Sequence, residues 1–309
     1  MTEVERIINN RGKVIPPDFL HPETRSDFFV DTDRKMLWIV SLDLLLEFDR
    51  ICSKYNLKYW LGYGTLLGAI RHDGFIPWDD DVDVCMPRAD YEKIQLHKDE
   101  FEHPYFLQTP YTDAHYYYSY IKLRNSNTTS LSKNYNENNN NGIALDIFCV
   151  DEWDKSEEGE ALYNEISSLI INNSTYMKIG HPNFIDDERV RNYNGEDPLE
   201  TYNKIQKLCK TYQGKNKEYI STPVITVYGY HRDIFSKTDI EETLCHKFEG
   251  LNFPIPSGYD NILRIIYGDY MEYPPIEKRG KWHTAILDAK RPYTSYLEDI
   301  KKGVKLWPE

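Results

Sequence analysis

The chain has 309 residues, a formal net charge of −13 and a hydrophobic fraction of 40%, enough to bury one large core or two closely packed ones. The acidic balance disfavours nucleic-acid binding, which depends on clustered Lys and Arg that displace counterions from phosphates. An anionic small substrate remains open, because a bound metal ion supplies positive charge that the net charge does not show.

The five cysteines, at positions 52, 85, 149, 209 and 245, are scattered and lack C-x-x-C spacing. This pattern predicts free thiols in a reducing compartment. The first residues lack the apolar segment of a signal peptide, and no later stretch offers about 18 uninterrupted apolar residues. We therefore expect a cytoplasmic protein without a transmembrane segment. Peripheral association with a membrane stays open.

Residues 1–30 are rich in proline and show no periodicity, which predicts an N-terminal arm lying over the domain. Apolar residues then recur every three or four positions from 33 to about 55, which predicts an amphipathic helix. Asp31, Thr32 or Asp33 is available to cap it. Three acids of this helix, Asp43, Glu47 and Asp49, are interpreted as part of its solvated outer face and not as an acidic site.

A short strand is expected at 57–61, and a second strand at 82–86 is followed by a helix that begins at Pro87, because proline suits a first helical turn. Residues 116–123 and 128–131 are predicted to form paired strands. The Asn-rich run 134–141 predicts a surface loop, and 143–150 a buried strand. Further helices are expected at about 157–178 and 199–213.

Asp81 and Asp83 alternate with Val82 and Val84 in the second of these strands. Side chains alternate between the two faces of a strand, so both carboxylates point to one side while the valines face the core. Carboxylates this close raise one another's pKa unless a cation neutralises them. Mg²⁺ (or Mn²⁺) suits this role, since it takes oxygen ligands from carboxylates and substrate phosphates. The alternative is a charged surface turn at 79–83.

Asp146 is a single acid inside the apolar strand at 143–150, where a carboxylate without a partner is costly to bury. It is either a buried acid satisfied by backbone donors or a third metal ligand. Its combination with Asp81 and Asp83 favours the metal site. All three are therefore the candidate catalytic and metal-binding residues.

The segment before these acids contains Gly62, Gly64 and Thr65. The two glycines permit a tight turn whose N–H groups approach phosphate oxygens. A helix that starts at Thr65 would point its positive end to the same place.

Five other residues are candidate substrate contacts. Lys122 and Arg124 share one strand face, and Arg71 follows the glycine turn, so each is placed to bind phosphate or is an ordinary surface cation. Trp78 is either a contact for a base or a quaternary ammonium group, or a core residue. His283, in a basic segment, contacts phosphate or only stabilises the fold.

The glycine turn followed by the three aspartates resembles the nucleotidyltransferase superfamily, in which such residues build a two-metal site. Within it, GTLLGAIRHDGFIPWDDDVDVCMPRADYEKI closely resembles the LicD family, named for phosphorylcholine transferases. Residues 122–129, 145–148 and 262–271 extend the resemblance, which spans about 35–285. It implies an α+β fold with a mixed β-sheet flanked by helices. We expect a catalytic core at 31–151 and a mainly helical C-terminal region at 152–309 packed on it.

The resemblance implies a metal-dependent phosphotransferase that moves a phosphorylated group, most simply phosphocholine from CDP-choline, to a hydroxyl of a glycan or glycolipid and releases CMP. Asp81 and Asp83 would bind one or two metal ions, and Asp146 would complete the site and accept the proton of the attacking hydroxyl. Fukutin-type animal relatives move ribitol phosphate. The absence here of a membrane anchor and of zinc-finger cysteines favours modification of bacterial teichoic acid or lipopolysaccharide.

Two alternatives stay open. A nucleotidyltransferase would use the same acids to transfer a nucleoside monophosphate and would release pyrophosphate. A catalytically silent, glycan-binding or regulatory relative is disfavoured because all three acids are present.

Overall fold

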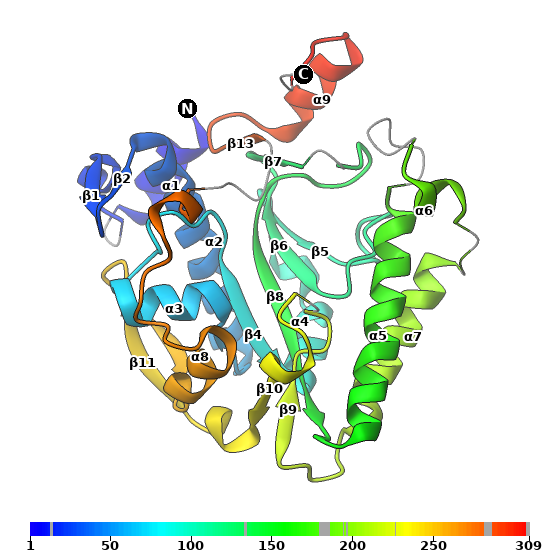
Figure 1. The fold of residues 1–309 in the computed structure, drawn as a ribbon. Helices are drawn as coiled ribbons and strands as arrows, with labels where there is room; N and C mark the ends of the chain where they lie inside the picture. The colour runs from blue at the N-terminus through cyan, green and yellow to red at the C-terminus, as the bar shows by residue number, and fades with distance from the viewer. Residues whose placement is uncertain are drawn as a thin grey trace.

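The computed structural model describes residues 1–12, 15–132, 135–178, 186–193, 195, 197–225, 227–280 and 286–306. It shows an α+β protein in which a mixed β-sheet is flanked by helices, as predicted (Figure 1). No helix in these ranges is long and apolar enough to cross a membrane.

The long helix α2 (Thr32–Tyr55) confirms the helix predicted from periodicity. Asp31 caps it, because its side chain accepts a hydrogen bond from Arg34 N at 2.8 Å. The helix ends at Tyr55, and the Asn56 that follows has a left-handed backbone with φ 52°. Most of its apolar side chains, Trp38 and Leu44 among them, are buried. The helix therefore lies inside the protein and supports the sheet.

The interpretation of Asp43 and Glu47 as a solvated face of α2 is wrong, because both are buried. The N-terminal helix α1 (Glu3–Arg11) packs on α2 and brings two arginines to these acids. Arg6 and Arg11 contact the Asp43 carboxylate at 3.2 and 2.9 Å. Periodicity within α2 could not show that a second helix, from the segment expected to be an irregular arm, supplies cations to this face.

The central sheet has seven strands within the described residues, and β8 (Ile143–Trp153) is its longest. On one side β8 pairs in parallel with β4 (Asp83–Pro87), which pairs with the short β3 (Trp60–Leu61). On the other side it pairs with β6 (Ile121–Asn125) along its first half and with β9 (Tyr219–Ser221) at its end. β5 (Tyr105–Gln108) and β10 (Ile234–Ser236) complete the sheet.

The predicted pairing of 116–123 with 128–131 is wrong. β6 begins only at Ile121 and lies between β5 and β8. β7 (Thr129–Leu131) instead pairs with β13 (Ile286–Asp288) from near the end of the chain. Short segments with strand-like composition do not specify their partner, since several edges offer equivalent backbone hydrogen bonds.

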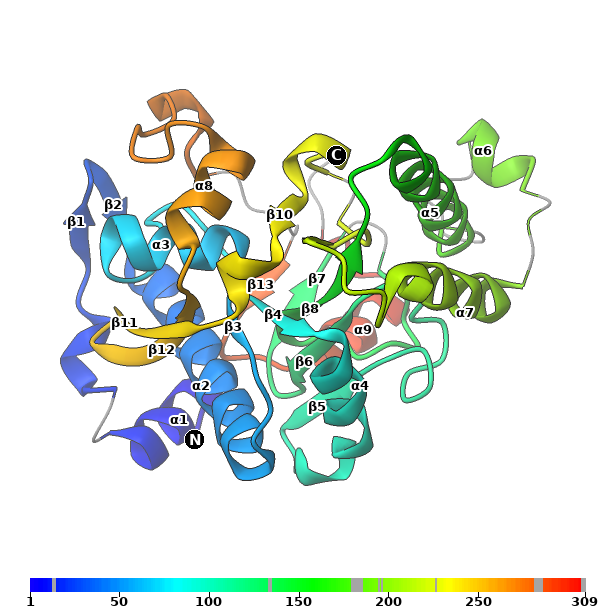
Figure 2. The same ribbon diagram turned by 90° about the horizontal axis from the view of Figure 1, so that it is seen from below.

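Helices cover the sheet on both flanks (Figures 1 and 2). α5 (Glu157–Tyr176) and α7 (Pro198–Cys209), close to the predicted bounds, lie side by side on one flank, beyond α4 (Arg88–Leu96). α3 (Tyr63–His72) and α8 (Tyr259–Tyr267) lie on the other flank, against the hairpin of β11 (Thr243–Phe248) and β12 (Leu251–Pro256). The remaining elements are the hairpin β1 (Glu23–Arg25) and β2 (Phe28–Val30) and the helices α6 (Glu188–Arg191) and α9 (Tyr293–Lys301).

Candidate active site

A row of charged residues crosses the three middle strands of the sheet. Asp146 in β8 lies directly opposite Asp83 in β4 and opposite Lys122 in β6. Directly opposed residues project to the same face and their Cβ atoms lie about 4.5–5.5 Å apart. The alternate residues of β4 and β8, Val84 and Ile147, are completely buried on the opposite face. The predicted division of these strands into a polar and an apolar face is therefore confirmed.

Asp146 has a cationic partner that the sequence did not reveal. Lys122 Nζ donates hydrogen bonds to both of its carboxylate oxygens, at 2.7 and 2.8 Å. The alternative in which backbone donors alone satisfy this acid does not apply. Arg124 lies two residues after Lys122 in β6 and is buried. It donates hydrogen bonds to Gln108 Oε1 at 2.7 Å and to Gly142 O at 2.6 Å.

A cavity of about 280 Å³ opens over this polar face. Asp81, Asp146, Lys122 and Arg124 all line it, so the structure brings together four of the residues singled out in the sequence. Tyrosines of the segment before β6 and asparagines of the Asn-rich loop also line the cavity. The lining includes Tyr116, Tyr118, Tyr120, Asn136, Asn139 and Asn141.

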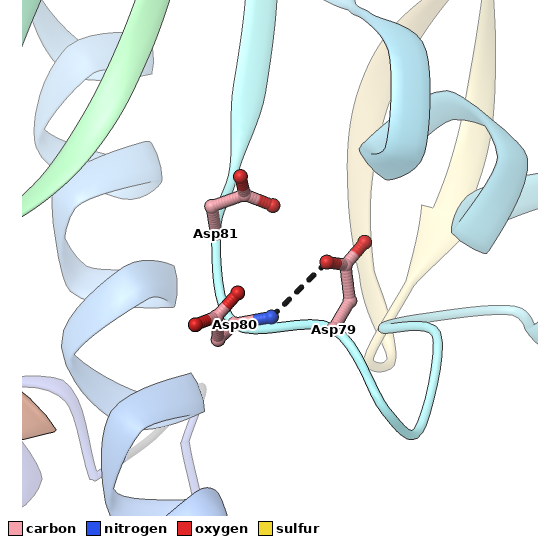
Figure 3. Close-up of side chains that lie close together, drawn as sticks. All are labelled: Asp79, Asp80 and Asp81. Carbon is pink, nitrogen blue, oxygen red and sulfur yellow. Dashed lines mark hydrogen bonds between the residues drawn. The ribbon is translucent and has the colours of Figure 1, made fainter. Parts of the chain in front are cut away.

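The turn that enters β4 carries three consecutive aspartates, Asp79, Asp80 and Asp81 (Figure 3). One oxygen from each carboxylate can be chosen so that all three lie within 4.8 Å of one another. Asp80 N donates to Asp79 Oδ1 at 3.1 Å, which fixes the turn. Arg34 donates to the main-chain oxygen of Asp79 at 2.8 Å.

The electrostatics of this turn favour a bound cation. Burial raises the pKa of Asp81 well above its ordinary value, and the carboxylates of Asp79, Asp83 and Asp146 raise it further. A group of hard oxygen donors in this state fits Mg²⁺ or Mn²⁺, which takes such ligands and relieves their repulsion. Asp79 and Asp80 were seen in the sequence only as part of a charged run, because alternation along β4 pointed to Asp81 and Asp83.

The glycine turn lies directly against these acids. Gly62 precedes α3, and a Cβ there would lie 2.7 Å from Cys85 Sγ in β4. A Cβ on Gly64 would lie 2.9 Å from Asp79 Oδ2. Both positions therefore require the close backbone approach that glycine allows. Thr65 is buried, and its hydroxyl accepts a hydrogen bond from Asp83 N at 2.8 Å, so it positions the first residue of β4.

Two predicted substrate contacts belong to a separate cluster and do not line the cavity. Arg71 donates to the main-chain oxygens of Tyr270 and Glu272, at 2.7 and 3.1 Å. Trp78 is covered by the guanidinium of Arg279, 4.6 Å from the ring centroid. These contacts join the turn before β4 to the segment after α8. The third of these candidates, His283, lies outside the described residues.

Sequence reasoning did not single out the tyrosines around the acids. Tyr118 and Tyr120 line the cavity. Tyr228 and Tyr267, from distant segments, lie close enough to Asp79 and Asp83 for those carboxylates to raise the pKa of each phenol, although burial is the larger cause. In a chain with 25 tyrosines no single one stands out. Only the fold selects these four.

Comparisons with known proteins show which families and proteins the chain is similar to. Residues 56–177 match the family model described as the LicD/FKTN/FKRP nucleotidyltransferase domain. The chain is 26% identical over 274 residues to the lipopolysaccharide cholinephosphotransferase LicD of Haemophilus influenzae, covering 79% of this chain and 94% of that protein. Uncharacterized proteins of Rickettsia prowazekii and Rickettsia typhi are 42% and 38% identical over 59 and 76 residues, covering 19% and 23% of this chain and 22% of each relative.

Proposed function

Because residues 56–177 match the family model of the LicD/FKTN/FKRP nucleotidyltransferase domain, we propose that this protein transfers choline phosphate from CDP-choline to a hydroxyl group of a glycan or glycolipid. The relative from Haemophilus influenzae, similar over most of both chains, is named as a cholinephosphotransferase acting on lipopolysaccharide. We propose the same class of reaction here, with a bacterial surface glycan as the acceptor.

One observation carries the proposal: carboxylates and cations line the same cavity. Asp81 and Asp146 supply negative charge, while Lys122 and Arg124 supply positive charge. The phosphoanhydride bond of a diphosphate has little reactivity until the charge on its oxygens is neutralised and the reacting atoms are held in line, so catalysis of this transfer depends on positioning and electrostatics. This cavity holds groups for both tasks.

Residues Asp79, Asp80 and Asp81 would hold a divalent cation, with Asp83 next along the strand. Bound there, the cation supplies positive charge that neutralises the diphosphate of the donor. Arg124 donates hydrogen bonds to two neutral oxygens, Gln108 Oε1 and Gly142 O, and lines the cavity, where its guanidinium would attract an incoming phosphate.

In the proposed step an oxygen of the acceptor attacks the β-phosphorus of the donor. The bond from this phosphorus to the bridging oxygen breaks, and CMP leaves with the electron pair. Asp146 accepts the proton of the attacking hydroxyl. Lys122, already on both oxygens of Asp146, holds this carboxylate in place and contacts the departing phosphate.

The released product tests the proposal. Purified protein is incubated with CDP-choline, CDP-ethanolamine or CDP-ribitol, a glycan acceptor and Mg²⁺, and the nucleotide is identified by chromatography. We expect CMP with CDP-choline, and none from the Asp81→Asn variant. Pyrophosphate formed from CTP and a phosphorylated acceptor would instead show a nucleotidyltransferase. No turnover with any donor, from protein that binds Mg²⁺ and is folded, would contradict both.

A further inference from the structure

Aromatic rings form a continuous series beside the acids. Tyr120 packs on Phe148 at 4.7 Å between centroids, and Phe148 packs on Tyr63 at 5.5 Å. Tyr63 stacks on Tyr228 at 5.6 Å with parallel planes. Tyr228 then meets Tyr267 edge to face at 5.8 Å. The series runs from the cavity wall to the C-terminal part of the chain.

The last two rings form a corner. The planes of Tyr228 and Tyr267 meet at 85°, and their hydroxyls are 3.2 Å apart and hydrogen-bonded to each other. Both residues are partly exposed. The hydroxyls pair with each other, and Tyr63 covers one face of Tyr228. The ring surface that the corner offers to a ligand is therefore the other side of Tyr228 and the ring of Tyr267. Such faces attract cations through the ring quadrupole.

The surroundings of the corner are acidic. Asp79 and Asp83 lie within electrostatic range of both phenols, and Asp81 within range of Tyr228. In the described part of the chain no lysine or arginine lies over either ring. Arg71 lies within electrostatic range of Tyr267, but its guanidinium donates hydrogen bonds to two main-chain oxygens.

Two other aromatic groups near the acids already have cations over them. Lys122 Nζ lies 5.1 Å from the centroid of Tyr120 and 5.9 Å from that of Tyr118. Arg279 covers Trp78. A second cation at either place would be repelled by the first, whereas the corner combines aromatic faces with nearby carboxylates.

We propose that the corner formed by Tyr228 and Tyr267 binds the trimethylammonium group of the choline donor. This assignment rests on the proposed function and adds the orientation in which the donor binds. The choline end of the donor points to the corner, the diphosphate lies at the aspartates, and the cytidine occupies the cavity between Lys122 and Tyr118. A trimethylammonium group has no N–H donor, so contact with ring faces is its main means of specific recognition.

The test compares two donors that differ only in their methyl groups. KM and kcat are measured with CDP-choline and CDP-ethanolamine, both in Mg²⁺, and the ratio of their kcat/KM values is the readout. The ring-removing variants are Tyr228→Leu and Tyr267→Leu. The matched variants Tyr228→Phe and Tyr267→Phe keep the ring and lose only the hydroxyl pair. Melting temperatures identify the folded variants.

We expect the wild-type preference for CDP-choline to fall about tenfold in each leucine variant, mainly through KM, and to persist in the phenylalanine variants. Tyr118→Leu, at the proposed cytidine end, should weaken the binding of both donors alike and leave the ratio of their kcat/KM values unchanged. In the wild type, tetramethylammonium should inhibit competitively against CDP-choline more strongly than ammonium does, a measurement that needs no variant.

Two results would overturn the assignment while leaving the proposed function intact. One is folded leucine variants that keep the wild-type preference. The other is a preference that disappears in Tyr118→Leu instead. If the wild type turns over neither donor, the proposed function fails, and the assignment of the corner fails with it.

Discussion

The ammonium group of Lys122 bridges both carboxylate oxygens of Asp146, at 2.7 and 2.8 Å, across two neighbouring strands. Both side chains are about 15% exposed, so water screens the pair little. The negative charge of Asp146 is thereby balanced by a cation of the protein itself. Asp79, Asp80 and Asp81 form a separate group of acids whose oxygens lie close enough together to hold a metal ion.

Replacement of Lys122 by Met should leave Asp146 without its cation. We expect the free energy of unfolding to fall by about 1–3 kcal/mol, the usual cost of an unsatisfied buried charged group, and turnover to fall at least about tenfold. Urea denaturation and steady-state kinetics measure the two effects. Lys98→Met, which removes an exposed partner of Asp99, is the control and should change stability by less than about 1 kcal/mol. Unchanged turnover in a folded Lys122→Met variant would exclude Lys122 from the reaction.

Replacement of Asp81 or Asp83 by Asn should preserve the fold and remove activity. We expect at least a 100-fold loss of turnover, on the order of the loss of one positioned electrostatic group, and weaker Mn²⁺ binding by calorimetry. Asp73→Asn is a suitable control, because Asp73 is exposed and has the left-handed backbone that Asn tolerates. Chelation with EDTA should abolish wild-type turnover, and Mg²⁺ should restore it. Activity that persists after complete removal of metal would refute the metal site.

Replacement of Asp43 by Ala should be strongly destabilising. This carboxylate is buried and contacts Arg6, Arg11 and Tyr105. Its removal leaves two partly buried arginines without their partner, which costs about 3–5 kcal/mol in comparable sites. Asp33→Ala, on the same helix but 77% exposed, should cost less than about 1 kcal/mol. Equal denaturation midpoints for the two variants would show that the network of α1 and α2 contributes little.

Asp233 should make stability depend on pH. Burial raises its pKa well above the ordinary value of 3.8, although Ser221 and Tyr63 donate hydrogen bonds to it. From about pH 4 upward the folded state therefore keeps a proton that the unfolded state has released. This contribution to stability falls as pH rises, until the folded-state pKa is reached.

The Asp233→Asn variant should lose this dependence. The difference in unfolding free energy between variant and wild type should shift in favour of the variant as pH increases from about 4 to about 8. Urea denaturation at several pH values measures it. A difference that stays constant with pH would show that Asp233 titrates alike in both states. Asp49→Asn, which replaces another hydrogen-bonded acid, serves as the comparison.

Local patterns in the sequence were sufficient to predict which segments form helices and strands and which side of each is buried. The three- and four-residue spacing predicted α2, and the alternation of Asp and Val predicted the two faces of β4. Periodicity works here because a helix or strand buries one face whatever its partner is. The glycine turn and the pair Asp81 and Asp83 were identified in this way.

Only the tertiary structure decided what those faces contact. β7 pairs with β13, more than 150 residues away in the chain, and α1 brings arginines to Asp43. The pairing of Lys122 with Asp146 depends on the register of β6 on β8. Tyr228 and Tyr267 reach the acids because a distant loop and α8 pack beside α3. Such contacts join residues far apart in sequence, and their partners are chosen by the packing of the whole chain, which no local pattern encodes.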